Sequence, residues 1–290
     1  MSWFRRLWCR IFKCKPPSPP SGPLPPSRPG LLMCYFGVQD GQMASTGAHV
    51  NAAHIGSWGD WSSVAGRQQL TDTMVRYAKE AIANGVDKLI FTLDWCVLTP
   101  TNPRQLLPEA TATKYLIEFC DRLTAEGLMD FVIGWYPVDE PNIPEIALSA
   151  GDIYITNSWI RNVTCHYTSG GVPAQALPLV CCYGQSNGVY PGIGSYDWVS
   201  FDNYGNDIFA NGWYQHLVDQ LGPSQRTFLV AGGSNPWRES PDPYYLHAQG
   251  DPRVVMIVPF AWFPSPDGIG FNGMQPAYDK VGDLIKAGGV

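Results

Sequence analysis

Two adjacent carboxylic acids, Asp139 and Glu140, stand in the segment of this sequence best suited to proton transfer, ahead of Pro141 and Asn142. A carboxyl group that is buried, or that lies beside a second carboxylate, keeps its proton to a higher pH than a free one. Such a group can act as a general acid near neutral pH. Because consecutive residues of a strand point in opposite directions, both acids face one pocket only if the chain bends after Pro137.

Other carboxylates follow separate apolar runs of the chain. Asp94 and Asp202 each end such a run, and Glu239 follows Ala231 by eight residues in a predicted loop. Cleavage of a glycosidic bond normally requires two carboxyl groups, roughly 6.5–9.5 Å apart for inversion and about 5–5.5 Å apart for retention. We expect Glu140 to be the proton donor, and the sequence leaves its partner open among Asp139, Asp202, Asp94 and Glu239.

Rings and amides accompany these acids. Sugars stack their C–H faces on aromatic rings and bond their hydroxyls to carboxylates and amides, and eleven Trp residues suit that use. The residues expected to bind a substrate, besides Asp94, are His54, Trp95, Asn203, Tyr204, Trp237 and Trp262.

Each of these residues also has a purely structural interpretation. Glu140 could satisfy free N–H groups at a helix start, Asp139 could cap a helix, and Asp202 could accept hydrogen bonds from a loop. Asp94 could form a salt bridge, an exposed Glu239 would be solvated, and an aromatic ring is more often a core residue. His49 and His54 lack partners at metal-ligand spacing, so we expect no metal and no cofactor.

The elements that must position these residues follow an alternating order. Eight short apolar runs, without polar alternation, are typical of parallel strands buried on both faces. They cover residues 31–37, 49–55, 88–94, 130–135, 177–182, 197–202, 227–231 and 254–260. Helical periodicity lies between several of them, and Gly85 and Gly127 follow two of these helices as expected of C-terminal caps.

Eight strands alternating with helices predict an α/β fold, a (β/α)₈ TIM barrel over residues 31–290. The connections after the first and fifth runs are short for a full helix, so we expect an irregular barrel. Active sites of such barrels lie at the carboxyl ends of the strands, where the polar residues above are found. The first strand is not followed by a glycine-rich phosphate-binding motif, which argues against a dinucleotide or P-loop fold.

The N-terminal residues differ from the rest. Residues 1–15 combine six large apolar side chains with Arg5, Arg6, Arg10 and Lys13 at helical spacing, and residues 16–30 are rich in proline. We expect a basic amphipathic leader, suited to a membrane surface or a larger assembly, and a polyproline linker. The sequence has no spanning helix and no clear signal peptide, and its net charge of −6 argues against nucleic acid as a partner.

The segment 134–142, Gly-Trp-Tyr-Pro-Val-Asp-Glu-Pro-Asn, resembles the fourth-strand motif of the large clan of retaining (β/α)₈ glycoside hydrolases. The resemblance implies that Glu140 is the acid/base residue, that Trp262 is a sugar platform and that residues 202–204 end the sixth strand. Two positions depart from the pattern, since Asp139 replaces the usual Asn and no Glu ends the seventh run. The sequence has Ala231-Gly232-Gly233-Ser234 where the clan has its nucleophile.

Three hypotheses follow from the sequence. The first is a glycoside hydrolase acting on a poly- or oligosaccharide, with Glu140 as proton donor. The second is an inactive carbohydrate-binding barrel that lost the seventh-strand nucleophile. The third is a structural component tethered through residues 1–30.

Overall fold

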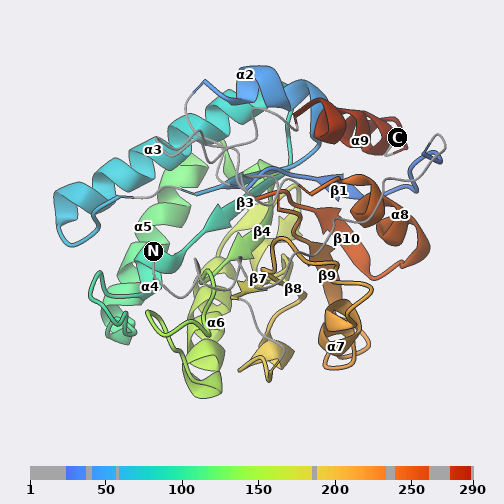
Figure 1. Cartoon of the computed structure of the whole chain (residues 1–290). Helices are drawn as coiled ribbons and strands as arrows, with labels where there is room; N and C mark the ends of the chain where they lie inside the picture. Colours follow the sequence, from blue (N-terminus) through green and yellow to red (C-terminus); the bar gives the residue numbers. More distant parts are fainter. Residues whose placement is uncertain are drawn as a thin grey trace.

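Eight parallel strands form the centre of the protein in a computed structural model that describes residues 24–36, 41–56, 59–184, 188–232, 239–260 and 275–288. The predicted (β/α)₈ barrel is confirmed, with one strand inside or overlapping each predicted apolar run (Figure 1). The barrel strands are β1 Leu32–Met33, β2 Ala53–Ile55, β3 Leu89–Thr92, β4 Val132–Tyr136, β7 Val180–Tyr183, β8 Trp198–Phe201, β9 Arg226–Leu229 and β10 Val254–Ile257.

Hydrogen bonds connect neighbouring strands around the whole barrel. One parallel sheet has the order β1-β10-β9-β8-β7, and a second has the order β2-β3-β4. The N–H of Ala52 donates to the carbonyl of Met33 at 3.1 Å, which joins β1 to β2. A parallel bridge between Trp135 and Leu179 joins β4 to β7. The carboxyl ends of all eight strands therefore meet at one end of the barrel, which we call the mouth.

Helices and short helical turns surround this cylinder (Figure 1). The longer helices are α3 Val64–Ala83, α5 Glu109–Ala125, α6 Ala150–Thr164, α7 Trp213–Val218, α8 Asp242–Gly250 and α9 Gln275–Gly288. The shorter elements are α2 Met43–Thr46, α4 Asp94–Val97, η1 Gly47–His49, η2 Met129–Phe131, η3 Ala174–Ala176, η4 Ile193–Ser195 and the hairpin of β5 Thr168–Ser169 with β6 Val172–Pro173. As expected, the described parts of the β1–β2 and β7–β8 connections contain only short helical elements.

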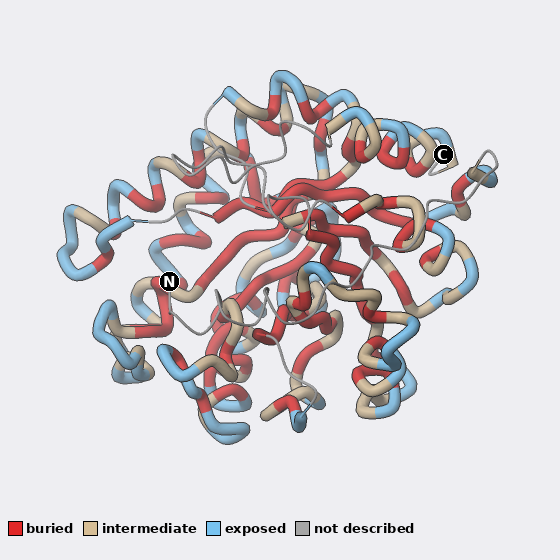
Figure 2. The backbone as a smooth tube through the Cα atoms, viewed as in Figure 1, coloured by how far each residue is buried: buried red, intermediate tan, exposed pale blue. Residues whose placement is uncertain are grey.

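The buried side chains form two layers. Figure 2 shows the buried residues in red along the strands and on parts of the helices. An outer layer fills the space between strands and helices and includes Leu70, Met74, Phe91 and Phe119. An inner layer fills the barrel and includes Ile90, Tyr136, Val180, Cys182, Phe228 and Met256. Because both faces of each strand are buried, the strands contain apolar residues without alternation.

Local sequence signals set the helix ends. The Ser63 hydroxyl accepts from the Gly66 N–H at 3.0 Å at the start of α3, and Ser149 with Asp152 forms a capping box at the start of α6. Gly85 and Gly127 have φ values of +82° and +68°, the left-handed conformation expected of glycine after a helix.

Residues 24–30, the second half of the predicted linker, pack against the barrel. The carbonyl of Pro25 accepts from the Tyr245 hydroxyl at 2.7 Å, and the N–H of Arg28 donates to Gln249 Oε1 at 2.7 Å. The Arg28 guanidinium also bonds the carbonyls of Ala248 and Val254. The folded unit thus begins before residue 31, while residues 1–23 lie outside the described part. Within the described residues, no helix has the length and apolar character needed to cross a membrane.

Candidate active site

The chain bends sharply after β4, as a shared pocket for Asp139 and Glu140 requires. Glu140 has a φ of +45°, a left-handed conformation that is uncommon for a residue with a side chain. Its N–H donates to the carbonyl of Cys182 at 2.9 Å, which fixes this turn to the end of β7. Backbone strain of this kind costs of order 1–3 kcal/mol and is concentrated at functional sites.

The Glu140 side chain lies against the chain that leaves β7. A Cβ atom added to Gly184 would stand 3.3 Å from Glu140 Oε1, so a larger residue would crowd this carboxylate. Asn142 holds Gly184 in place through two bonds: its Oδ1 accepts from the Gly184 N–H at 2.8 Å, and its Nδ2 donates to the Gly184 carbonyl at 3.2 Å. The Asp-Glu-Pro-Asn segment is therefore anchored to the end of β7 at Glu140 and at Asn142.

Asp139 bonds to Tyr136, the last residue of β4. The Tyr136 hydroxyl accepts the Cys182 N–H at 3.2 Å and lies 2.6 Å from Asp139 Oδ1, so its own proton points to the carboxyl group. Burial and, after it, the negative charge of Glu140 raise the pKa of Asp139 to about 7, while the Tyr136 hydrogen bond opposes the shift.

Two further charged groups act on Asp139: Asp94, which follows β3, and Arg104, which lies in the loop after α4. Arg104 Nη1 lies 3.4 Å from Asp94 Oδ2, and the guanidinium stacks 4.7 Å from the centre of the Trp61 ring. Burial raises the pKa of Asp94, and the charge of Arg104 opposes that rise. The charges of Asp94 and Arg104 both act on Asp139, so these groups share one electrostatic environment.

Asp202 and Tyr204 reach the mouth from the end of β8. Asp202 Oδ1 accepts from Cys182 Sγ at 3.0 Å. Burial, followed by the charge of Asp202, raises the pKa of Tyr204, and Glu140 contributes to the same shift. The Tyr204 ring stacks on Phe260, with centroids 5.3 Å apart and planes at 13°. Acids that follow β3, β4 and β8 therefore act electrostatically on Asp139 or on Tyr204 at the mouth.

Glu239 is buried and its carboxylate accepts several hydrogen bonds. The alternative interpretation of Glu239 as an exposed, solvated loop residue is therefore wrong. Its Oε2 accepts from the Gly232 N–H at 2.6 Å and from the Tyr244 hydroxyl at 2.8 Å, and its Oε1 accepts from the Gly205 N–H at 2.6 Å. Burial raises the pKa of Glu239 to about 7 against these donors. The carboxylate thus stands beside the end of β9, where both of its oxygens are already occupied.

Of the other predicted binding residues that the structure describes, Trp95, His54 and Asn203 are buried. Trp95 is 3% exposed and packs on Phe119 of α5, with ring centroids 5.4 Å apart, because the turn α4 directs it into the outer layer. His54 is buried in the barrel, stacked on Phe36 at 4.2 Å, and burial lowers its pKa to about 3. Asn203 is buried and accepts from Asn206. Trp237 and Trp262 lie outside the described residues.

Sequence reasoning did not select Tyr136, Arg104 or Phe260. Tyr136 shares the inward face of β4 with Gly134, so the strand period of two could have identified it. Arg104 reaches Asp94 only because a hairpin pairs Leu98 with Leu106, and no sequence pattern marks that contact.

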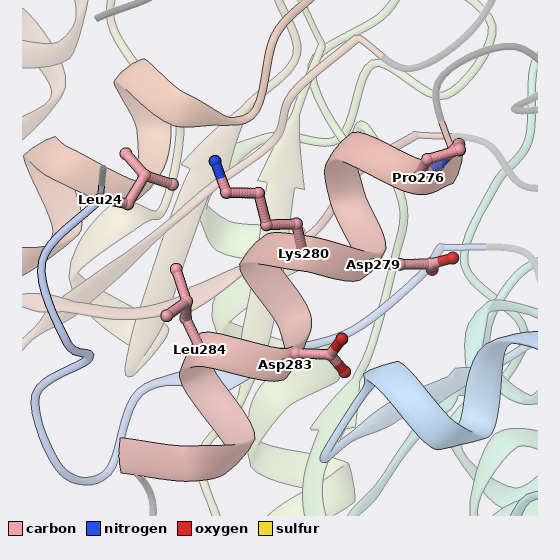
Figure 3. A pocket seen from close by; sticks show the side chains of 6 residues that line it. All are labelled: Leu24, Pro276, Asp279, Lys280, Asp283 and Leu284. Atoms are coloured by element: carbon pink, nitrogen blue, oxygen red, sulfur yellow. The ribbon is translucent and has the colours of Figure 1, made fainter. Parts of the chain in front are cut away.

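A separate hollow of about 710 Å³ lies on the outer surface of α9 (Figure 3). It is lined by Leu24, Pro276, Asp279, Lys280, Asp283 and Leu284. Two of its acids already pair with His49, whose Nδ1 lies 2.8 Å from Asp283 Oδ1 and whose Nε2 lies 3.8 Å from Asp279 Oδ2. None of the residues that line this hollow lies at the carboxyl end of a barrel strand. Among the described residues, no group of three or more potential ligands is arranged to hold a metal ion.

Comparison with known proteins relates this fold to glycoside hydrolases. No protein-family model and no curated protein sequence matches the chain. Among solved structures, a family 17 β-1,3-glucanosyltransferase from Rhizomucor miehei is 10% identical, with 83% of this chain and 90% of that chain covered and a TM-score of 0.51. An active-site mutant of that enzyme, solved in complex with laminaritriose, matches with a TM-score of 0.50.

Two enzymes of other glycoside hydrolase families match equally well. A fungal family 18 endo-β-N-acetylglucosaminidase is 12% identical, covering 89% of this chain and 99% of that chain with a TM-score of 0.51. The family 30 xylanase Xyn30A from Clostridium acetobutylicum is 11% identical, covering 91% and 72% with a TM-score of 0.51. The chain therefore has the TIM-barrel fold found in several glycoside hydrolase families, at low sequence identity.

Proposed function

We propose that this protein is a glycoside hydrolase that cleaves a poly- or oligosaccharide at the mouth of the barrel. The observation that supports it best is the strained turn at Glu140, after which the Glu140 charge acts on the neighbouring Asp139 carboxyl group. Fold alone does not define activity, so the proposal depends on this arrangement of side chains.

In this proposal Glu140 is the proton donor to the leaving oxygen and Asp202 is the second carboxylate. The two groups come from different strands, β4 and β8, and the charges of both act on Tyr204. The stacked rings of Tyr204 and Phe260 offer an apolar surface for a sugar face. Asp94 and Arg104 supply hydrogen-bonding groups for sugar hydroxyls, and Trp237 and Trp262 remain proposed binding residues from the sequence.

The substitution Glu140→Gln tests this proposal. Loss of a general acid lowers turnover by roughly 10²- to 10⁴-fold while leaving the sugar contacts in place. Hydrolysis of laminari-, xylo- and chito-oligosaccharides would be measured together with their affinity, and the product anomer would distinguish inversion from retention. Glu145→Gln is the matched control, because Glu145 is an exposed acid of the same loop. Equal loss in both variants contradicts the role of Glu140.

A carbohydrate-binding barrel without turnover is the second candidate. It is favoured by the seventh-strand end, where Ala231 and Gly232 carry no carboxylate and Glu239 is occupied by backbone and tyrosine donors. Wild-type protein that binds these oligosaccharides but never cleaves them would support the binder. Protein that neither binds nor cleaves any of them would contradict both functions.

A further inference from the structure

Strand β7 lies between β4 and β8, the strands that precede the two proposed catalytic acids. It pairs in parallel with β8, and a bridge from Trp135 to Leu179 joins it to β4. Side chains of a strand alternate between its two faces, and Val180 and Cys182 lie in the inner layer of the barrel. Cys182 is therefore the last inward-facing residue of β7, and it stands at the mouth.

Three separate groups of Cys182 form hydrogen bonds at the mouth. Its carbonyl accepts from the Glu140 N–H at 2.9 Å, and its N–H donates to the Tyr136 hydroxyl at 3.2 Å. Its thiol Sγ lies 3.0 Å from Asp202 Oδ1. Glu140 and Asp202, which follow strands on opposite sides of β7, are therefore bonded to one residue.

The thiol is the donor in the bond to Asp202. Burial, followed by the charge of Asp202, raises the pKa of the Cys182 thiol well above its usual range, so the sulfur keeps its proton. An ionised carboxylate only accepts hydrogen bonds, so this proton points to Asp202 Oδ1. The Asp202 backbone is fixed separately, because its N–H donates to the Tyr183 carbonyl at 2.8 Å. The thiol bond thus orients a carboxylate whose backbone is already in place.

We propose that Cys182 is a positioning residue that sets the separation between the Glu140 and Asp202 carboxyl groups, through its carbonyl on one side and its thiol on the other. The catalytic meaning of this inference rests on the proposed function. In a two-carboxylate mechanism this separation determines whether a water molecule fits beside the sugar. A displacement of about 1 Å can lower turnover by roughly 10²-fold. The thiol takes no covalent part, because its proton remains on sulfur.

Substitution of Cys182 tests the positioning role. Cys182→Ala removes the thiol but keeps the backbone bonds to Glu140 and Tyr136. We expect kcat to fall by roughly 10- to 10²-fold while KM changes little, because a misplaced carboxylate affects the transition state more than the bound sugar. A serine hydroxyl is a stronger donor than a thiol but reaches less far, so Cys182→Ser should recover part of the lost turnover.

Cys34→Ala is the matched control. Cys34 is also buried in the inner layer, and its thiol bonds a backbone carbonyl, that of Tyr35, at 3.6 Å. This variant should keep turnover within a few-fold of wild type. If Cys182→Ala retains wild-type turnover, or if the Ser and Ala variants are equally impaired while circular dichroism shows both folded, the positioning role is wrong. For a protein that binds sugars without cleaving them, affinity replaces turnover, and we expect the same order of variants.

The thiol bond itself can be measured without a sugar. The infrared S–H stretching band moves to lower frequency as the hydrogen bond strengthens, and a carboxylate is a stronger acceptor than a backbone carbonyl. The band lost in Cys182→Ser should therefore lie below the band lost in Cys34→Ser, and Asp202→Asn should raise its frequency.

An S–H band of Cys182 that Asp202→Asn does not move would contradict the bond on which the inference depends. If the Cys182 variants fail to fold, the S–H band that moves in Asp202→Asn still tests this bond. Because the infrared measurement needs no substrate, it distinguishes failure of this inference from failure of the proposed function.

Discussion

At the residue scale, Glu239 is a carboxylate at the mouth whose hydrogen bonds give it a structural role. Both oxygens of Glu239 accept bonds from Gly232, Gly205 and Tyr244, which belong to three different segments. Its backbone carbonyl also accepts from Tyr278 of α9 at 2.8 Å. Glu239 therefore stabilises the loops after β8 and β9, although it stands near the position of a seventh-strand nucleophile.

Glu239→Gln should destabilise the fold, because the amide group would set an N–H donor against a buried N–H or O–H donor. Leaving one buried donor unsatisfied costs about 1–3 kcal/mol. The free energy of unfolding in urea measures this loss. Glu118→Gln is the control, since the Glu118 side chain is 58% exposed on α5. If the two variants have equal stability, the carboxylate does not hold these loops.

At the scale of elements, the end of β7 is the part on which the Glu140 turn depends. A methyl group at Gly184 would stand 2.3 Å from Ile143 Cγ2, and it would also approach Asn142 Oδ1 at 3.4 Å. The close approach of the two segments explains why glycine is required there.

We expect Gly184→Ala to cost about 1–3 kcal/mol of stability, the usual penalty of overpacking, and to lower turnover or sugar affinity by displacing Glu140. Gly194→Ala is the matched control, because nothing lies within 4 Å of a Cβ atom added at that position in η4. Thermal unfolding and oligosaccharide binding are the two readouts. A Gly184→Ala variant with normal values in both would show that the two segments are not tightly coupled.

The sequence predicted elements better than side-chain directions, for a physical reason. Strands buried on both faces leave continuous apolar runs, so all eight were recognisable. Side-chain direction depends on local turns: α4 begins at Asp94, and successive residues of a helix differ by about 100°, so Trp95 turns away from the mouth while Asp94 faces it. The position of Glu239 depends on a loop fold that residue spacing does not encode.

At the scale of the whole molecule, the barrel includes chain that the sequence assigns to a linker. Residues 24–30 bond to α8 and to β10 through Pro25 and Arg28. Residues 1–15 stay proposed as a contact with a membrane surface or a larger assembly, which a vesicle-binding assay with and without that segment would test.

Two truncations test whether residues 24–30 stabilise the barrel. Removal of residues 1–30 should leave the protein less stable than removal of residues 1–23, because only the longer truncation deletes the Pro25 and Arg28 bonds. Four hydrogen bonds at about 1 kcal/mol each suggest a difference of roughly 3–4 kcal/mol. Urea unfolding of the two proteins measures it. Equal stability would mean that residues 24–30 contribute nothing to the barrel.

The central claim, that a saccharide binds at the mouth beside Glu140, is tested most directly by a crystal structure of Glu140→Gln soaked with laminaritriose, xylotriose or chitotriose. We predict a sugar ring against the Tyr204–Phe260 pair, with a glycosidic oxygen within hydrogen-bond distance of the residue 140 side chain. A saccharide bound only in the hollow on α9, or none bound at the mouth at millimolar concentration, would contradict the claim.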